Sequence, residues 1–373
     1  MKNSLKINDI LVELENINII NILSFLTPPI IYYGVKNGIS PSYNLRKDFK
    51  IKNANTKILP TEVIRKIDDI DETRLLQQKY GSSIVDFFKT ISQEIPEEDL
   101  TILFNNFMTL TTKTKNFKLL NRIIGNHTAG QYIAEYNRIE VSGRNYESTI
   151  DHELFHTAST IVDSDEGMVF TGFAQIKYVN NKIGVGLNEG YTQHLTEKYF
   201  GNKKKLLKAY TYEKNIACAV EMIVGEKQMQ SLYLNANLKG LVDILKQYNT
   251  EEKIYDFITT LDLVNKYLQQ NINTPKAFEI VTSSLKSINN FLIETFTNKI
   301  IIDNSDRKDF KTLIIENKGL LTHFISSLPD RVKCKKKTFE ILDVDVLGNI
   351  LVDVISKYEN NPKISENVGN KRK

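Results

Sequence analysis

The spacing of apolar positions predicts a chain that is helical on both sides of a short mixed segment. From about residue 61 apolar side chains recur at helical intervals, and Pro96, followed by three acidic residues, marks a helix start. Residues 129–143 differ, because apolar side chains occur at both odd and even positions. Glycines at 130 and 143 lie at the two ends of this segment. This pattern is typical of a strand buried on both faces.

The next stretch predicts two helices with a β-hairpin between them. Ser148 or Thr149 can cap a first helix that runs to about Val162. Residues 167–186 then predict a hairpin that turns at Asn180–Asn181. The segment LNEGYTQHLTEKYFG predicts a second helix, which ends at Gly201.

The complete pattern predicts an α+β fold in four regions. Residues 1–115 form an irregular and then helical N-terminal region, and residues 116–202 form a core with a small sheet and the two helices. Residues 203–330 are expected to be helical. Residues 331–373 are expected to hold one further strand or helix and a polar tail. No internal repeat or low-complexity linker marks these boundaries.

The composition adds little to this picture. The chain has 373 residues, 41% of them hydrophobic and 25% charged, which is typical of a globular protein. A net charge of +4 over this length requires neither nucleic acid nor an anionic membrane as partner. Lysines cluster at 203–205, at 333–337 and at the C-terminus; we expect solvated faces there, with nucleic-acid binding as a minor alternative.

Cysteine usage and hydropathy favour a cytoplasmic protein. Cys218 and Cys334 lie far apart without CxxC spacing, which fits a reducing compartment. The apolar stretch near the N-terminus follows Glu13 and Glu15 and is interrupted by asparagines and prolines, so it is a poor secretion signal. No stretch reaches the roughly 18 apolar residues of a membrane span.

The segment HELFH, residues 152–156, is the strongest chemical signal. His152 and His156 are two of only five histidines, and at a spacing of four they share one face of a helix. One Zn²⁺ can bridge such a pair at about 2.0–2.1 Å per nitrogen. Glu153 would lie beside the metal without ligating it, where a general base is needed. The alternative is a pair of partly buried structural histidines.

The third ligand separates the kinds of HExxH site. The continuation HExxHxxGxxH would need glycine and histidine where the chain has Ser159 and Val162, so that kind is excluded. Glu189, in LNEGYTQ, would complete two imidazoles with a carboxylate and leave one position open for water. The alternative role for Glu189 is an acid favoured by the helix dipole. Reserve candidates for the third ligand are Asp163, Asp165 and Glu166.

HExxH followed by a glutamate on a later helix resembles the gluzincins, the thermolysin-like zinc metallopeptidases. LNEGYTQ is similar to the third-ligand helix of the zinc aminopeptidases in that group. The order of YIAEYN, HELFH, hairpin and NEGYT, over residues 129–201, also resembles a set of uncharacterised bacterial gluzincin-like proteins. The resemblance implies that residues 116–202 form a zincin-like catalytic core, with one Zn²⁺ on His152, His156 and Glu189.

The chain departs from these families at two places. Residues 134–137 read AEYN and do not match the GAMEN exopeptidase motif, which puts aminopeptidase activity in doubt. Thermolysin-like enzymes have an aspartate four residues after the third ligand, where this chain has Gln193. Groups that could orient the histidine ligands are therefore Asp151, Asn188 and Gln193.

These residues predict metal-assisted peptide hydrolysis. The strand at 131–141 would pair with an extended peptide or protein substrate. An oxyanion donor is also expected, and the resemblance to the gluzincins implies that it is a tyrosine downstream of Glu189. Candidates for that tyrosine are Tyr191, Tyr210 and, as the preferred one, Tyr212. His194 is expected at the surface or in helix packing, and His127 and His323 to be structural. A zincin-fold binding or regulatory protein without turnover is the alternative function.

Overall fold

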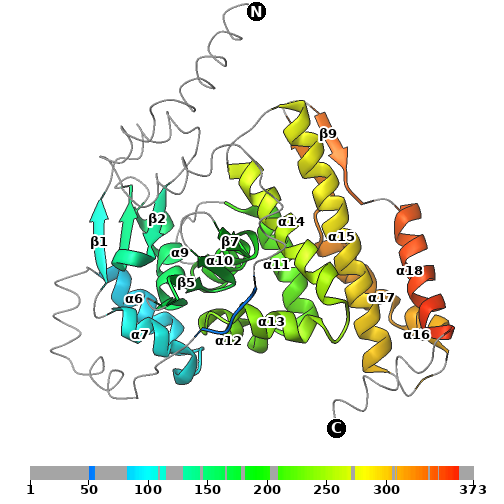
Figure 1. The fold of residues 1–373 in the computed structure, drawn as a ribbon, viewed down its shortest axis with the longest axis horizontal. Helices are drawn as coiled ribbons and strands as arrows, with labels where there is room; N and C mark the ends of the chain where they lie inside the picture. Colours follow the sequence, from blue (N-terminus) through cyan, green and yellow to red (C-terminus); the bar gives the residue numbers. More distant parts are fainter. Residues whose placement is uncertain are drawn as a thin grey trace, which may run out of the picture.

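The computed structural model is mixed α+β and largely helical (Figure 1). The expected irregular start, His127 and Asp165 lie outside the residues that it describes. The described residues are 50–54, 82–107, 110–114, 129–142, 146–163, 166–177, 181–201, 209–269, 274–304, 307, 309–334, 337–342 and 344–360.

Two short helices precede the first sheet and pack against the helix that carries HELFH. They are α6 (Ser82–Ile91) and α7 (Thr101–Phe107), with a 3₁₀ turn, η2 (Glu97–Leu100), between them. Pro96 precedes the 3₁₀ turn, as expected from its fixed φ and missing N–H. Phe87 of α6 packs edge-on against Phe155, with 4.9 Å between ring centroids, so α6 covers the buried side of HELFH.

The first sheet contradicts the single long strand predicted at 129–143. Its strands are β1 (Thr111–Thr114), β2 (Gly130–Ile133) and β3 (Arg138–Val141), in the order β1-β3-β2. β1 runs parallel to β3, and β2 runs antiparallel to it. The predicted strand is therefore a hairpin, and β2 is an edge of the sheet.

Asn137 is the physical reason for this reversal. It has a φ of 42°, in the left-handed region that asparagine tolerates better than most residues. Its side chain donates to the backbone carbonyl of Asn106 and accepts from the hydroxyl of Tyr132, at 2.5 and 2.9 Å. The first of these partners lies on α7, so the turn depends on a contact between distant residues.

The HELFH helix, α9 (Tyr146–Ala158), ends four residues earlier than predicted. The hydroxyl of Ser159 donates to the carbonyl of Phe155 at 2.9 Å, and that of Thr160 to the carbonyl of His156 at 2.6 Å. Such bonds compete with the backbone ladder of a helix. The chain then continues as β4 (Thr160–Asp163), which pairs with the next strand.

A four-stranded meander follows in place of one hairpin. β4 pairs with β5 (Met168–Thr171), β5 with β6 (Ala174–Lys177), and β6 with β7 (Asn181–Ile183), all antiparallel. The turn between β5 and β6 lies at Gly172, whose φ of 50° suits glycine in a tight hairpin. The turn predicted at Asn180–Asn181 lies partly outside the described residues, which omit 178–180; Asn181 is the first residue of β7.

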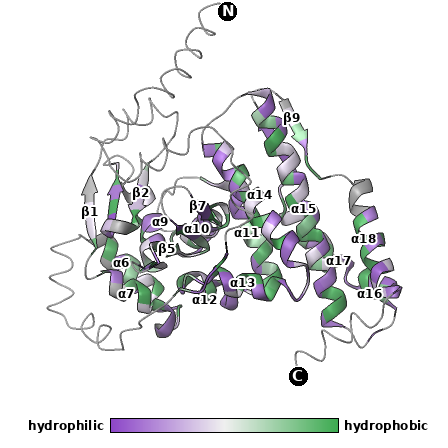
Figure 2. Cartoon of the chain, viewed as in Figure 1, coloured by the Kyte–Doolittle hydropathy of each residue, from purple (hydrophilic) through white to green (hydrophobic). Residues whose placement is uncertain are grey.

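The LNEGYTQ helix is confirmed as α10 (Val185–Phe200), with Gly201 at its end. It lies centrally, packed against α9, α11, α14 and β6 (Figure 1). Although buried, α10 is largely hydrophilic (Figure 2). Two of its polar side chains find partners within the helix: the hydroxyls of Thr192 and Thr196 each donate to the carbonyl four residues back, at 2.7 Å.

The predicted helical region beyond residue 203 is also confirmed, and it is followed by a small hairpin and a last helix. These elements are α11 (Thr211–Val224), α12 (Glu226–Leu234), α13 (Leu238–Leu245), α14 (Glu251–Gln269), α15 (Pro275–Asp303), α16 (Phe310–Glu316), α17 (Lys318–Ser327), β8 (Arg331–Cys334), β9 (Lys337–Glu340) and α18 (Val344–Glu359). Among these described helices, none has an apolar stretch long enough to cross a membrane.

Candidate metal centre

α9 presents His152 and His156 side by side. Their ring centroids are 4.9 Å apart with the planes at 78°, and the two Nε2 atoms are 3.2 Å apart. Both residues are under one tenth exposed, at 8% and 7%. The other face of α9 packs into the core through Ile150, Leu154 and Phe155. The i, i+4 spacing therefore brings the two imidazoles together, as the sequence predicted.

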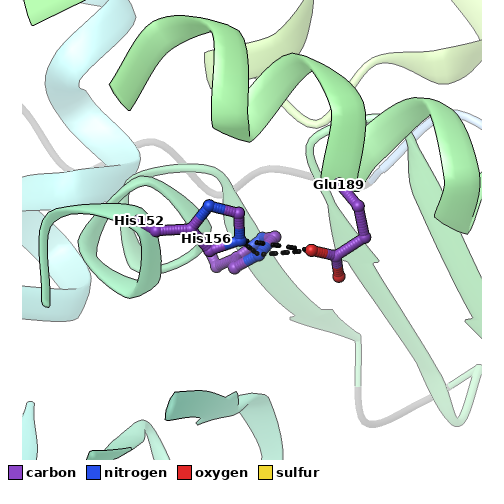
Figure 3. A group of neighbouring side chains, drawn as sticks. All are labelled: His152, His156 and Glu189. Atoms are coloured by element: carbon purple, nitrogen blue, oxygen red, sulfur yellow. Dashed lines mark hydrogen bonds and ion pairs between the residues drawn. The ribbon is translucent and has the colours of Figure 1, made fainter. Parts of the chain in front are cut away.

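Glu189 reaches the same point from α10. Its Oε2 lies 3.2 Å from Nε2 of His152 and 3.5 Å from Nε2 of His156. Figure 3 shows the carboxylate directed at the imidazole pair from the facing helix. The side chain of Glu189 is 18% exposed, more than either histidine, so the carboxylate side of the group is nearest to solvent.

The three ligand atoms fit a single tetrahedral metal ion. Bonds of 2.0–2.1 Å at tetrahedral angles place neighbouring ligand atoms about 3.3–3.4 Å apart. The observed separations of 3.2, 3.2 and 3.5 Å match that edge. Two imidazole nitrogens and one carboxylate oxygen are also suitable donors for a divalent cation. This group could therefore hold a metal ion.

The electrostatics keep Glu189 ionised. Burial alone would raise the pKa of its carboxyl group, but the neighbouring His156 and His152 outweigh burial and hold that pKa well below its usual range. The charged form is the one a metal ligand needs.

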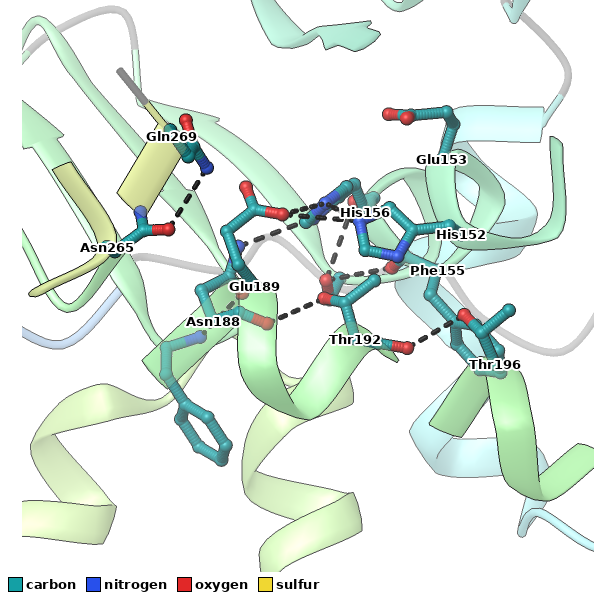
Figure 4. A network of polar contacts seen from close by, with 12 residues as sticks. His152, Glu153, Phe155, His156, Asn188, Glu189, Thr192, Thr196, Asn265 and Gln269 are labelled. Atoms are coloured by element: carbon teal, nitrogen blue, oxygen red, sulfur yellow. Dashed lines mark hydrogen bonds and ion pairs between the residues drawn. The ribbon is translucent and has the colours of Figure 1, made fainter. Parts of the chain in front are cut away.

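Glu153 has a different environment from Glu189. It is 5% exposed, its carboxylate accepts the backbone N–H of Tyr132 in β2, and Figure 4 shows this carboxylate apart from the three converging side chains. Burial raises the pKa of Glu153 to about 7, with a smaller lowering by His152 and a smaller increase from Glu189. A carboxyl group with a pKa near neutrality can both accept and release a proton.

Asn188 contacts Nδ1 of His156, the ring nitrogen that does not face Glu189. Its Nδ2 lies 3.3 Å from Nδ1 of His156, and its Oδ1 accepts the backbone N–H of Phe173 at 3.2 Å. In this orientation the amide donates to Nδ1, whereas ligation through Nε2 requires a proton on Nδ1 and an acceptor facing it. A metal-bound state would therefore need the oxygen of Asn188 to face His156.

The two other residues expected to orient the ligands lie elsewhere. Asp151 is buried on α9, but Nδ1 of His152 has no hydrogen-bond partner among the described residues, so Asp151 does not hold that ring. Gln193 donates to Glu197 on the next turn of α10, at 2.9 Å. Of the three expected residues, the structure brings only Asn188 to a ligand.

Tyr210, and not the preferred Tyr212, is the tyrosine beside the histidines. Its ring stacks on His152 with 5.5 Å between centroids and 12° between planes, and its hydroxyl bonds to the carboxylate of Glu189. Burial, followed by the nearby Glu189 and Glu153, raises the pKa of Tyr210 well above its usual value, so the hydroxyl stays a donor. The hydroxyl of Tyr212 instead bonds to the backbone of Lys333 in β8.

The backbone explains this difference between the two tyrosines. Tyr210 precedes α11 with a φ of 52°, whereas Tyr212 lies inside the helix and faces another direction. The start of α11 can approach α10 closely because Gly190 has no side chain: a Cβ there would lie 2.3 Å from the backbone oxygen of Glu213. The glycine next to Glu189 thus brings Tyr210 into the site.

The remaining candidates lie away from the imidazole pair. Asp163 accepts the backbone N–H of Glu166 at 3.0 Å, and Glu166 forms an exposed ion pair with Lys52. Tyr191 donates to Glu221 at 2.6 Å. His323 is exposed on α17. None of these contacts reaches the metal group.

Asp262 is a supporting residue that the sequence reasoning missed. This buried aspartate of α14 accepts the backbone N–H groups of Gly184 and Gly186, at 2.9 and 2.8 Å. It caps the N-terminus of α10 and so fixes the helix that carries Glu189. Its 76-residue separation from Gly186 leaves no local signal for this contact.

Comparison of this chain with family models, curated proteins and solved structures finds no match. The assignment of this site therefore depends on the chemistry and geometry of its own residues.

Proposed function

We propose that this chain is a zinc-dependent metallopeptidase of the gluzincin type, with a zincin-like core formed by α9, α10 and the sheets beside them. The observation that carries the proposal is the convergence of His152, His156 and Glu189 from two helices, with a separate carboxyl group, Glu153, beside them. Zinc is the proposed metal because it favours nitrogen and oxygen donors in tetrahedral sites with one open position. A cytoplasmic location remains the prediction from cysteine usage.

The residues divide the chemistry between them. A zinc ion bound there would lower the pKa of a water molecule to about 7 and polarise the scissile carbonyl. Glu153, whose pKa is raised to about 7, takes the proton of that water and later returns a proton to the leaving amine. The hydroxyl of Tyr210 stays neutral and donates to Glu189 in this structure; in the reaction this single donor would turn from Glu189 to the developing oxyanion.

The edge strand β2 is the proposed substrate-binding element. Among the described strands β2 pairs only with β3, and the backbone N–H of Tyr132 bonds to the carboxylate of Glu153. An extended peptide that adds to the free edge of β2 would therefore lie close to the proposed general base. This arrangement supports a peptide or protein substrate.

One observation favours the alternative of a zincin-fold binding protein without turnover. Nδ1 of His152 has no hydrogen-bond partner among the described residues, whereas a metal-binding histidine commonly donates that N–H to an acceptor. A weakly oriented ligand would support metal binding more readily than efficient catalysis.

The two functions are separated by turnover of a mixed peptide library, followed by mass spectrometry, with wild type and Glu153→Gln loaded with zinc. We expect wild type to cleave peptides, and Glu153→Gln to keep its zinc but to lose about 10²–10⁴-fold in rate, because only the proton transfer is removed. Equal cleavage by both proteins would contradict the mechanism. Zinc binding without cleavage by wild type would favour the binding protein.

A further inference from the structure

A second cluster of titratable side chains lies between α10 and α11. His194 of α10 has its Nδ1 3.1 Å from the Sγ of Cys218 and its Nε2 3.2 Å from Oε1 of Glu221, both on α11. The other carboxylate oxygen of Glu221 accepts the hydroxyl of Tyr191 at 2.6 Å. The order of groups is thus thiol, imidazole, carboxylate and phenol.

Helix geometry makes this arrangement specific. Tyr191 and His194 are three residues apart on α10, and Cys218 and Glu221 are three apart on α11, so each pair shares a helix face. The imidazole is held at both nitrogens, with the thiol on one side and the carboxylate on the other. A cysteine that only fills space in a core needs neither partner.

The charges around the imidazole favour its protonated form. Burial would lower the pKa of His194, but the hydrogen bonds to Cys218 and Glu221 outweigh burial and raise it to about 9. Burial likewise would raise the pKa of Glu221, but the bonds from His194 and Tyr191 hold it below its usual value. Glu221 is therefore an anion that stabilises an imidazolium at position 194.

The other charged side chains nearby are paired with each other. Lys214 of α11 bonds to Glu197 of α10 at 2.7 Å, and Lys198 of α10 bonds to Glu226 of α12 at 2.6 Å. These two pairs add no net charge to the cluster. The thiol of Cys218 therefore meets a cationic partner at hydrogen-bond distance.

The cluster is also within reach of small molecules. Cys218 is partly exposed, and the side chains of His194 and Glu221 are 22% and 15% exposed. Reactive cysteines are found partly exposed beside a cationic side chain, whereas fully buried ones are inert.

We propose that Cys218, held at hydrogen-bond distance from His194, is a nucleophilic thiol that exchanges reversibly with low-molecular-weight disulfides and releases its proton to solvent as it reacts. In this reaction the sulfur of Cys218 attacks one sulfur of the disulfide, a new S–S bond forms and the old S–S bond breaks. The departing thiolate takes a proton from solvent. The protein thiol is oxidised and half of the small disulfide is reduced, so no other reagent is needed.

This site is independent of the metal centre. It shares no residue with His152, His156 or Glu189, and its chemistry needs neither a metal nor turnover. The proposal therefore stands or fails separately from the peptidase proposal.

The test uses the full-length chain with Cys334→Ser, so that Cys218 is its only thiol. The probe is oxidised glutathione at pH 7, and mass spectrometry measures the glutathione added to Cys218. His194→Asn and Glu221→Gln are compared with Lys198→Gln, which breaks a neighbouring ion pair without touching the thiol. Circular dichroism checks that each variant is folded.

We expect His194→Asn to slow the reaction roughly tenfold at pH 7, because it removes the cationic side chain that lies 3.1 Å from the attacking sulfur. Glu221→Gln should slow it in the same direction, and Lys198→Gln should leave it unchanged. An equal rate with and without His194, or no addition to the folded chain, would overturn the proposal.

Discussion

Two carboxylates beside His152 meet opposite electrostatic conditions, and this difference assigns their roles. Burial raises the pKa of Glu153 to about 7, whereas the two imidazoles hold the pKa of Glu189 well below its usual range in spite of burial. A pair of acids whose pKa values are separated in this way is typical of sites where one is a proton carrier and the other stays charged. This difference supports the proposed roles, with Glu189 as a metal ligand and Glu153 as the general base.

The role of Tyr210 gives a prediction at the level of one hydroxyl group. Tyr210→Phe should lower kcat on a cleaved peptide by about 10²–10³-fold, because it removes the neutral donor next to Glu189. Tyr212→Phe is the matched control, since its hydroxyl bonds to the backbone of Lys333. Steady-state kinetics of both variants check this. A larger loss in Tyr212→Phe would restore Tyr212 as the oxyanion donor.

The amide of Asn188 gives a prediction on metal affinity. In Asn188→Asp both carboxylate oxygens are acceptors, so one can take the N–H of Phe173 and the other a proton on Nδ1 of His156. We expect zinc to bind about 10-fold more tightly in Asn188→Asp and 10–100-fold more weakly in Asn188→Ala. Competition with a chromophoric chelator measures both affinities. Unchanged affinity in the two variants would exclude Asn188 from orienting the ligand.

At the scale of elements, the structure shows what positions these residues. α9 supplies the histidine pair, α10 supplies Glu189, and the start of α11 closes over the site through the contact at Gly190. Asp262 of α14 fixes the first turn of α10. The site is therefore held by packed helices and not by loops, as a precise constellation requires.

Asp262 is expected to be important for the stability of α10. Asp262→Ala would leave two buried N–H groups at a helix start without their charged acceptor, so we expect a loss of about 3 kcal/mol in the free energy of unfolding and weaker zinc binding. Asp243→Ala, which breaks an exposed i, i+4 pair with Lys239, should cost less than about 0.5 kcal/mol. Urea denaturation compares the two; similar losses would show that the cap contributes little.

The elements that the sequence predicted well are those encoded by nearby residues. The spacing of HELFH and the residues around Glu189 are local patterns, and both segments are helices in the structure. The prediction of a single strand through Asn137 and of a helix to about Val162 was wrong. The reversal at Asn137 depends on Asn106, and the early end of α9 depends on the pairing of β4 with β5. Tyr210 and Asp262 reach the site only through helix packing, which no local pattern encodes.

At the scale of the whole molecule, α10 connects the two polar clusters. Its first half carries Glu189, the proposed metal ligand, and its second half carries His194, which bonds to α11. The helices from α15 to α18 lie on the side of the molecule opposite the first sheet (Figure 1). The sequence predicted that this region is helical, but where its domain boundaries fall remains a prediction.

The partly buried His194 gives the molecule a pH-dependent stability. The pKa of His194 is raised to about 9 in the folded protein, against about 6.5 when unfolded, so its contribution is fully present below pH 6.5 and is lost as pH rises through 9. We expect wild type to lose on the order of 1 kcal/mol more than His194→Asn between these pH values, after allowance for partial exposure. Urea unfolding at pH 6.5 and 9.5 measures this, and equal losses in both proteins would contradict it.

The most direct test of the central claim is the zinc content per chain after dialysis against limiting zinc, measured by atomic absorption. We predict about one ion per chain for wild type, as a site of three protein ligands implies, and a content far below one for His156→Ala and Glu189→Ala. Glu166→Ala, which removes an exposed acid paired with Lys52, should keep the wild-type content. A wild-type chain that binds no zinc, or a Glu189→Ala chain that binds it as well as wild type, would contradict the account.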